Sequence, residues 1–230
     1  MRFEELNWFD IEEYLQHDDR LILVLGACEQ HGYLSLLCDV RIPMALADAA
    51  SQQSGVLVTP AINYGVSPYF LEYPGTISLR VSTLLDMIED VVRSVHRQGF
   101  RRLLFLNGYG GNTPAQLRLH EVANQLPNLA ISWYAWWQSN SVIEVAQKHN
   151  LKPTHASWLE AFPFTRVAPL PNEPKIPPYV PGLVSALEAR KVYGDGNFGG
   201  PYSVENFIMD EIFKASLLDI LQILQFKTPQ

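Results

Sequence analysis

Two short apolar runs constrain the fold of this chain more than any other feature of its sequence. They cover residues 21–25 and 103–106, and a glycine follows each run within two residues. A continuous apolar run of this length is typical of a strand that is buried on both faces, as in a parallel sheet. A short strand is predicted at 56–58 and a further strand at 129–134. The sequence therefore indicates a sheet that lies inside the protein.

Helical patterns separate these predicted strands. Apolar residues recur at helical spacing after Asp39, with Pro43 tolerated in the first turn. The clearest amphipathic pattern covers residues 82–98, with Ser82 as the expected N-cap and Gly99 ending the helix. Further helices are predicted at 114–125, with Thr113 as N-cap, at 142–147 and at 203–225.

The order of these elements predicts the fold class. Strands that alternate with helices indicate right-handed βαβ units and a mostly parallel sheet covered by helices. Residues 162–181 are rich in proline and 194–200 in glycine, and both segments are predicted to be irregular. The sequence shows no internal repeat and no flexible linker. We therefore expect an α/β fold in which residues 1–230 form a single domain.

The composition narrows the function classes. The 24 acidic and 17 basic residues give a formal charge of −7, which argues against a nucleic-acid partner because phosphates require a basic patch. The two cysteines exclude a disulfide-rich secreted scaffold. The N-terminus lacks the apolar core of a secretory signal, and no segment has the roughly 18 apolar residues of a transmembrane helix. We expect a soluble cytoplasmic protein that does not bind membranes.

Polar residues gather after the first predicted strand, where ligands bind in open α/β sheets. Glu29, His31 and Asp39 supply two carboxylates and one imidazole within one short segment. Zn²⁺ and Mn²⁺ accept such mixed oxygen and nitrogen ligands, and a bound ion can activate water and polarise a carbonyl. The alternative is a polar turn in which Asp39 caps the following helix. The spacing alone does not decide between them.

Other segments could contribute to a site at the same edge of the sheet. The glycine-rich turn at 108–111 precedes a helix and could cradle an anion, but it lacks the last glycine and the lysine of nucleotide-binding loops. A tight strand-to-helix turn explains these glycines equally well. An apolar ligand pocket could be lined by three tryptophans, which are Trp136, Trp137 and Trp158.

Several motifs together resemble the creatininase (creatinine amidohydrolase) family. The resemblance covers about residues 20 to 225 and rests on Gly26-Ala-Cys-Glu-Gln-His-Gly32, Asp39, Tyr64-Gly65, Pro74-Gly-Thr-Ile-Ser-Leu79, Asn107-Gly-Tyr-Gly-Gly-Asn112, and His155-Ala156 with Glu160. It implies a three-layer α/β/α sandwich with a mostly parallel sheet, often assembled as a homo-oligomer, a hexamer. It also implies hydrolysis of non-peptide amide bonds in small cyclic or formyl-type substrates.

The resemblance also implies roles for individual residues. The implied ligands of one or two divalent ions, commonly Zn²⁺ or Mn²⁺, are Glu29, His31, Asp39 and Glu160. His155 near Glu160 is implied to be catalytic, and we expect its imidazole to protonate the leaving nitrogen. We expect the backbone N–H groups of Gly110 and Gly111 to stabilise the oxyanion.

The sequence departs from the family pattern at three places. The family usually has a metal-binding His in the middle of Asn-Gly-His-Gly-Gly-Asn, whereas this chain has Tyr109 at that second-site position. A neutral phenol is a poor ligand, so one of two metal positions is expected to be weak or empty. The segment between His31 and Asp39 lacks the usual Pro-His-Leu-Pro and is one residue shorter. Ser157 and Trp158 replace the family's Gly-Glu.

These departures keep two rival functions open beside a metal-dependent amidohydrolase. Tyr109 fits a catalytically impaired protein that keeps the fold and binds a small ligand or a partner. The turn at 108–111 fits an α/β enzyme that uses a nucleotide.

Overall fold

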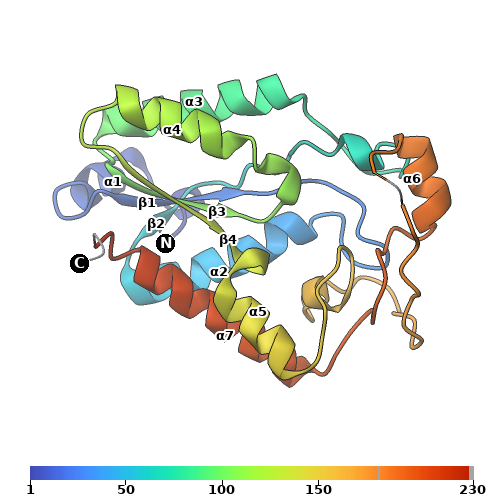
Figure 1. Cartoon of the computed structure of the whole chain (residues 1–230). Helices are drawn as coiled ribbons and strands as arrows, with labels where there is room; N and C mark the ends of the chain where they lie inside the picture. Colours follow the sequence, from blue (N-terminus) through green and yellow to red (C-terminus); the bar gives the residue numbers. More distant parts are fainter. Residues whose placement is uncertain (181, 228–230) are drawn as a thin grey trace.

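The centre of the computed structural model is a four-stranded parallel sheet, and the structure describes residues 1–180 and 182–227 (Figure 1). The strands lie in the order β2-β1-β3-β4 and pair in parallel throughout. Their bounds are β1 Arg20–Leu25, β2 Leu57–Val58, β3 Arg102–Asn107 and β4 Ala130–Ala135. In β1 and β3 every residue after the first is buried, as their apolar sequences predict.

Helices cover both faces of the sheet and form two separate hydrophobic cores. One core joins the sheet to α3 and α4, and the other joins it to α2, α5 and α7 (Figure 1). The helix bounds are α1 Trp8–Tyr14, α2 Cys38–Ser54, α3 Val81–Gln98, α4 Ala115–Gln125, α5 Asn140–Lys148, α6 Ala186–Tyr193 and α7 Asn206–Ile223. This arrangement confirms the predicted three-layer α/β/α sandwich.

Two predicted helix caps are wrong, and the alternative role of Asp39 as a cap is excluded. Helix α3 begins at Val81 with Arg80 at its N-cap, so Ser82 lies inside the first turn. The Thr113 hydroxyl donates to the carbonyl of Gly110 at 2.6 Å instead of capping α4, which begins two residues later. Asp39 lies within the first turn of α2 and is buried, so it is not an N-cap.

The segments predicted to be irregular contain no helix or strand among their described residues, 162–180 and 194–200. Between them lies α6, which the sequence analysis did not predict. Its start carries a capping box, in which the Ser185 hydroxyl accepts from the N–H of Glu188 and the Glu188 carboxylate accepts from the N–H of Ser185. This signal was present in the sequence.

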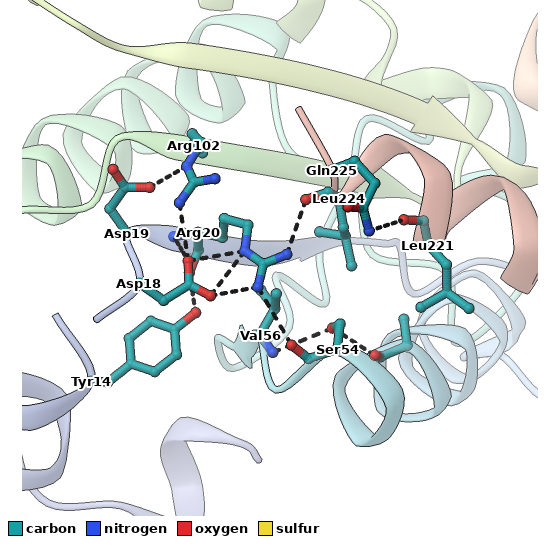
Figure 2. Close-up of polar contacts among 11 residues, drawn as sticks. Tyr14, Asp18, Asp19, Arg20, Ser54, Val56, Arg102, Leu221, Leu224 and Gln225 are labelled. Carbon is teal, nitrogen blue, oxygen red and sulfur yellow. Dashed lines mark hydrogen bonds and ion pairs between the residues drawn. The ribbon is translucent and has the colours of Figure 1, made fainter. Parts of the chain in front are cut away.

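A polar network fixes the amino end of the sheet (Figure 2). The Asp18 carboxylate accepts hydrogen bonds from Arg20, at 2.6 to 3.0 Å, and from Arg102, at 3.3 Å. The Arg20 guanidinium also donates to the carbonyls of Ser54 and Leu224, at the ends of α2 and α7. These contacts link the starts of β1 and β3 to each other through Asp18, and they link β1 to the ends of α2 and α7.

Among the described residues, no helix is both long and apolar enough to cross a bilayer.

Candidate metal centre

A cavity of about 470 Å³ opens at the carboxyl ends of β1 and β3. Its walls combine carboxylates with aromatic rings. The lining residues are Glu29, Asp39, Tyr69, Phe70, Gly108, Tyr109, Gly110, Trp137, Pro153, Thr154, His155, Leu159, Glu160 and Phe198. Ligand sites in open α/β sheets lie at this edge, so the cavity is the leading candidate site.

Two glycines bring the first turn of α2 against the strand ends. A Cβ atom at Gly108 would lie 1.9 Å from the Asp39 carbonyl oxygen, and one at Gly26 would lie 2.6 Å from the same atom. Pro43 has no N–H to donate to this carbonyl, which is its usual helical partner. The close packing places the Asp39 side chain at the cavity.

His31, Asp39 and Glu160 form a compact group of ligand atoms. The His31 Nε2 atom lies 3.2 Å from Asp39 Oδ1 and 3.5 Å from Glu160 Oε1. The other ring nitrogen of His31, Nδ1, lies 3.0 Å from the Glu29 backbone carbonyl. A carbonyl can only accept, so Nδ1 carries a proton and, in the neutral ring, Nε2 presents its lone pair to the carboxylates. One cation could contact all three side chains.

Several buried atoms of this group lack the partner that burial normally requires. Glu29 Oε1, His31 Nε2 and Asp39 Oδ2 make no hydrogen bond with the described residues. Burying such a group without a partner costs roughly 1–3 kcal/mol, and more when it is charged. All three atoms can donate an electron pair. A divalent cation could contact His31 and Asp39 together with Glu160, so these residues fit a metal ion.

The charges in the cluster are unbalanced. Burial, with the nearby charge of Asp39, raises the pKa of Glu29 to about 8. Burial also raises the pKa of Asp39 to about 6, although His31 opposes this. Burial disfavours the charged form of His31, but Asp39 and Glu160 outweigh it and hold the pKa of the imidazole well above its usual value. The buried carboxylates thus outnumber the positively charged groups that could balance them.

Glu29, His155 and Tyr109 form a second group beside the first. The Tyr109 hydroxyl donates to Glu29 Oε2. The other carboxylate oxygen, Glu29 Oε1, lies 3.8 Å from His155 Nε2. The imidazole of His155 stacks on the Phe70 ring at a centroid distance of 4.8 Å. Burial and the charge of His31 lower the pKa of His155 to about 3, so the ring is neutral near pH 7.

The Gln30 side chain determines which nitrogen of His155 accepts a hydrogen bond. Its Oε1 accepts from the N–H of Gly32 at 3.1 Å, so its Nε2 is the donor. This Nε2 lies 3.1 Å from the Gly196 carbonyl and 2.9 Å from His155 Nε2. His155 Nε2 is therefore an acceptor, and the neutral ring carries its proton on Nδ1.

The structure brings together most of the residues that the sequence analysis singled out. The six ligand and catalytic candidates share one site, and they are Glu29, His31, Asp39, Tyr109, His155 and Glu160. Gly110 lines the cavity. Gly111 does not, because it packs so closely against Val66 that a Cβ would lie 2.2 Å from the carbonyl oxygen of that residue.

The expected tryptophan pocket is corrected. Trp137 lines the cavity, whereas Trp136 and Trp158 do not. Both are buried in the core between the sheet and the helices α2, α5 and α7, where Trp136 packs edge-on against Phe162. The indole N–H of Trp158 donates to the Lys152 carbonyl at 3.1 Å. These two side chains are therefore structural.

Sequence reasoning missed the contribution of the glycine-rich loop 194–200. Its Gly196 carbonyl holds Gln30, and the Phe198 ring lies 4.9 Å from the imidazole of His155. Asp195 anchors the loop by accepting hydrogen bonds from Lys175 and Tyr202. Glycine content marked an irregular loop, but nothing in the sequence linked it to a site more than 160 residues away along the chain.

Comparisons with known proteins identify relatives of this chain. A family model described as creatinine amidohydrolase matches residues 4–215. The chain is 34% identical over 116 residues to the creatinine amidohydrolase of Pseudomonas putida, covering 47% of this chain and 45% of that protein. It is 28% identical over 138 residues to the 3-dehydro-scyllo-inosose hydrolase of Thermotoga maritima, covering 57% and 44%. It is 37% identical over 109 residues to a mycofactocin precursor peptide peptidase of Mycobacterium tuberculosis, covering 43% of each.

Each of these matches spans less than half the length of the curated relative. Solved structures agree over the whole fold. A manganese creatininase superposes with a TM-score of 0.78 at 23% identity, covering 100% of this chain and 99% of that one. A mutant creatininase of Zn-Zn type gives 0.77 at 22% identity, covering 100% and 98%. The fold matches that of solved creatininases, and the family model covers nearly the whole chain, so this protein belongs to the creatininase family.

Proposed function

We propose that this protein is a metal-dependent hydrolase of a non-peptide amide C–N bond in a small cyclic or formyl-type substrate. The observation that carries the proposal is a pair of buried, unpartnered atoms that can donate an electron pair, His31 Nε2 and Asp39 Oδ2. Asp39 lines the cavity, and His31 lies directly beside it. The name of the Pseudomonas putida relative supports amide chemistry. The names of the manganese and Zn-Zn creatininases support a divalent ion, Mn²⁺ or Zn²⁺.

His31, Asp39 and Glu160 are the residues that would hold the ion. When bound, such an ion supplies a Lewis acid that polarises a carbonyl and lowers the pKa of water. The backbone N–H of Ala156 donates to Glu160 Oε2 at 2.6 Å, which leaves Oε1 facing His31. The Glu29 carbonyl orients His31 in the same way. Outer contacts of this kind orient ligands before an ion binds.

His155 is suited to carry a proton during hydrolysis. Its lowered pKa means that the resting ring is neutral, so it begins as a proton acceptor rather than as the acid that the sequence analysis proposed. It would take a proton from the attacking water when its Nε2 exchanges the Gln30 amide for that water, and it would then deliver the proton to the leaving nitrogen. One water is consumed, the C–N bond breaks, and an acid and an amine result.

The cavity wall favours substrates without negative charge. Among the described residues that line it there are three carboxylates and no lysine or arginine. An anionic substrate would find repulsion and no counter-charge apart from the ion itself. The rings of Tyr69, Phe70, Trp137 and Phe198 offer apolar faces to a compact, flat amide. We propose that the N–H of Gly110 assists by donating to the developing oxyanion.

A second candidate function rests on the Tyr109 phenol. Its hydrogen bond to Glu29 takes up a carboxylate oxygen that could otherwise bind metal. A catalytically impaired protein that binds a small ligand or a partner in the cavity would tolerate this loss. Such a protein would bind a neutral lactam without turnover, and a chelator would leave the binding unchanged.

The test combines metal analysis with a substrate panel. Purified protein is assayed for bound metal by mass spectrometry and for hydrolysis of lactams, cyclic amides and formamides. We expect His31→Ala and Glu160→Gln to lose both metal and hydrolysis, whereas His120→Ala, at an exposed histidine on α4, keeps both. Less than about a tenth of an equivalent of metal, with no gain on reconstitution, would overturn the proposal. The homo-oligomer stays a prediction. Light scattering, which gives the mass of the assembly in solution, can test it.

A further inference from the structure

Two potential ion positions lie side by side in the site, and they share a residue. One group is His31, Asp39 and Glu160, and the other is Glu29, His31 and His155. His31 can serve only one of them, because its Nδ1 is bonded to the Glu29 carbonyl and Nε2 is its only free ring nitrogen. One imidazole lone pair binds one ion. The two positions therefore compete for His31.

His31 is better placed to bind an ion at the first position, which it forms with Asp39 and Glu160. His31 Nε2 and Asp39 Oδ2 are buried and unpartnered, and Glu160 is held by the N–H of Ala156 with its Oε1 directed at His31. This position thus offers three side chains whose ligand atoms are free. Three protein ligands with an open coordination position are typical of catalytic zinc sites.

The second position is mostly taken up by hydrogen bonds within the protein. Glu29 Oε2 accepts from the Tyr109 hydroxyl, and His155 Nε2 accepts from the Gln30 amide. Gln30 is itself held by Gly32 and Gly196, so its amide cannot turn away without breaking two contacts. Without His31, only Glu29 Oε1 is left as a free ligand atom. One atom does not hold a divalent ion against water.

We propose that this centre binds a single divalent ion through His31, Asp39 and Glu160, and that the Tyr109 hydroxyl takes the place of a second ion by donating to Glu29. The inference rests on the proposed function, because it assumes that the first position binds metal. Tyr109 is a positioning residue here, since it holds Glu29 Oε2 with a neutral donor where a dinuclear centre would use a cation.

The experiment compares metal stoichiometry in three proteins. Wild type, Tyr109→His and Tyr109→Phe are dialysed against Zn²⁺ or Mn²⁺, and bound metal per chain is measured by mass spectrometry and calorimetry. We expect about one ion for wild type and for Tyr109→Phe, and about two for Tyr109→His, because both variants free Glu29 Oε2 but only histidine adds a ligand. Tyr109→Phe is the matched control, since it removes the hydroxyl without adding a ligand.

The outcomes separate this inference from the proposed function. Two ions in wild type overturn the single-ion proposal and leave metal dependence intact, whereas no ion in any protein overturns both. A folded Tyr109→His protein that stays at one ion overturns the role of Tyr109. Should that variant fail to fold, anomalous scattering from metal-loaded wild-type crystals decides. A single peak beside Asp39 and Glu160 supports the proposal, and a second peak beside Glu29 overturns it.

Discussion

His31 Nε2 lies 3.2 Å from Asp39 Oδ1, yet this buried nitrogen makes no hydrogen bond with the described residues. The ring is oriented by its other nitrogen, which lies 3.0 Å from the Glu29 carbonyl. An imidazole held in this way presents a lone pair to a carboxylate, an arrangement that is unfavourable unless a cation lies between them or the ring is protonated. This pair of residues is the basis of the proposed metal centre.

We expect metal to stabilise the folded protein through this pair. A ligand that binds only the native state adds about 3 kcal/mol at a concentration roughly a hundredfold above its dissociation constant. Thermal unfolding should therefore shift upward on addition of Zn²⁺ or Mn²⁺ and return with a chelator. His31→Ala should abolish the shift, while His120→Ala keeps it. An equal shift in both variants would show that the metal binds elsewhere.

Gly108→Ala should destabilise the protein, because the new Cβ would lie 1.9 Å from the Asp39 carbonyl oxygen. Forcing an atom into a packed interior typically costs about 1–3 kcal/mol. The matched control is Gly110→Ala, whose Cβ would meet its nearest neighbour, Trp137, at 3.9 Å. Urea unfolding measures both variants. Equal stability of the two would mean that α2 does not pack on the strand ends as described.

The ion pairs at the amino end of β1 should make stability depend on pH in a defined direction. Burial disfavours ionisation of Asp18, but hydrogen bonds from Arg20 and the charge of Arg102 outweigh it and lower the pKa of the carboxyl group. Because the folded-state pKa is lowered, this contribution is present above the unfolded value of about 3.9 and is lost as pH falls through the folded value.

Asp18→Asn should therefore cost stability at pH 7 and progressively less in acid. We expect a loss of about 1 kcal/mol at pH 7, since partly exposed ion pairs are screened by solvent. Asp210→Asn, at an exposed position on α7, is the control and should change little. The free energy of unfolding is measured between pH 3 and pH 7. A cost for Asp18→Asn that grows as pH falls would contradict this assignment.

Gln30→Ala should lower the rate of hydrolysis without removing the ion. The variant loses the amide that donates to His155 Nε2, so the proton of the ring can move between its two nitrogens. Losing an orienting contact of this kind typically costs about 10–100-fold. We expect kcat to fall by this factor while metal content stays at the wild-type level. Nitrogen NMR of His155 should change from one tautomer to a mixture, and Gln52→Ala, at an exposed position, should leave both unchanged.

The sheet could be predicted because β1 and β3 are apolar on both faces, a pattern that few other elements produce. Part of the metal site could be predicted because Glu29, His31 and Asp39 follow a strand within one segment. His155 and Glu160 lie more than 115 residues further along the chain, so only the family resemblance linked them to that segment.

Other features depend on contacts that sequence patterns do not encode. A tryptophan on a cavity wall and one in the core carry the same local signal, so Trp136 and Trp158 were placed in the pocket with Trp137. The hydrogen bond from Gln30 to the Gly196 carbonyl joins residues 166 positions apart, and it forms only when the loop 194–200 folds over the site. The caps predicted at Ser82 and Thr113 are wrong because α3 begins after Arg80 and α4 begins after Pro114.

The most direct test of the metal centre is anomalous diffraction from crystals of the wild-type protein grown with Zn²⁺ or Mn²⁺. Data collected on either side of the absorption edge locate the ion without reference to activity. We expect a peak about 2.0–2.2 Å from His31 Nε2 and from carboxylate oxygens of Asp39 and Glu160. A cavity without a peak at a saturating metal concentration, or a peak that contacts none of these three side chains, would contradict the proposed centre.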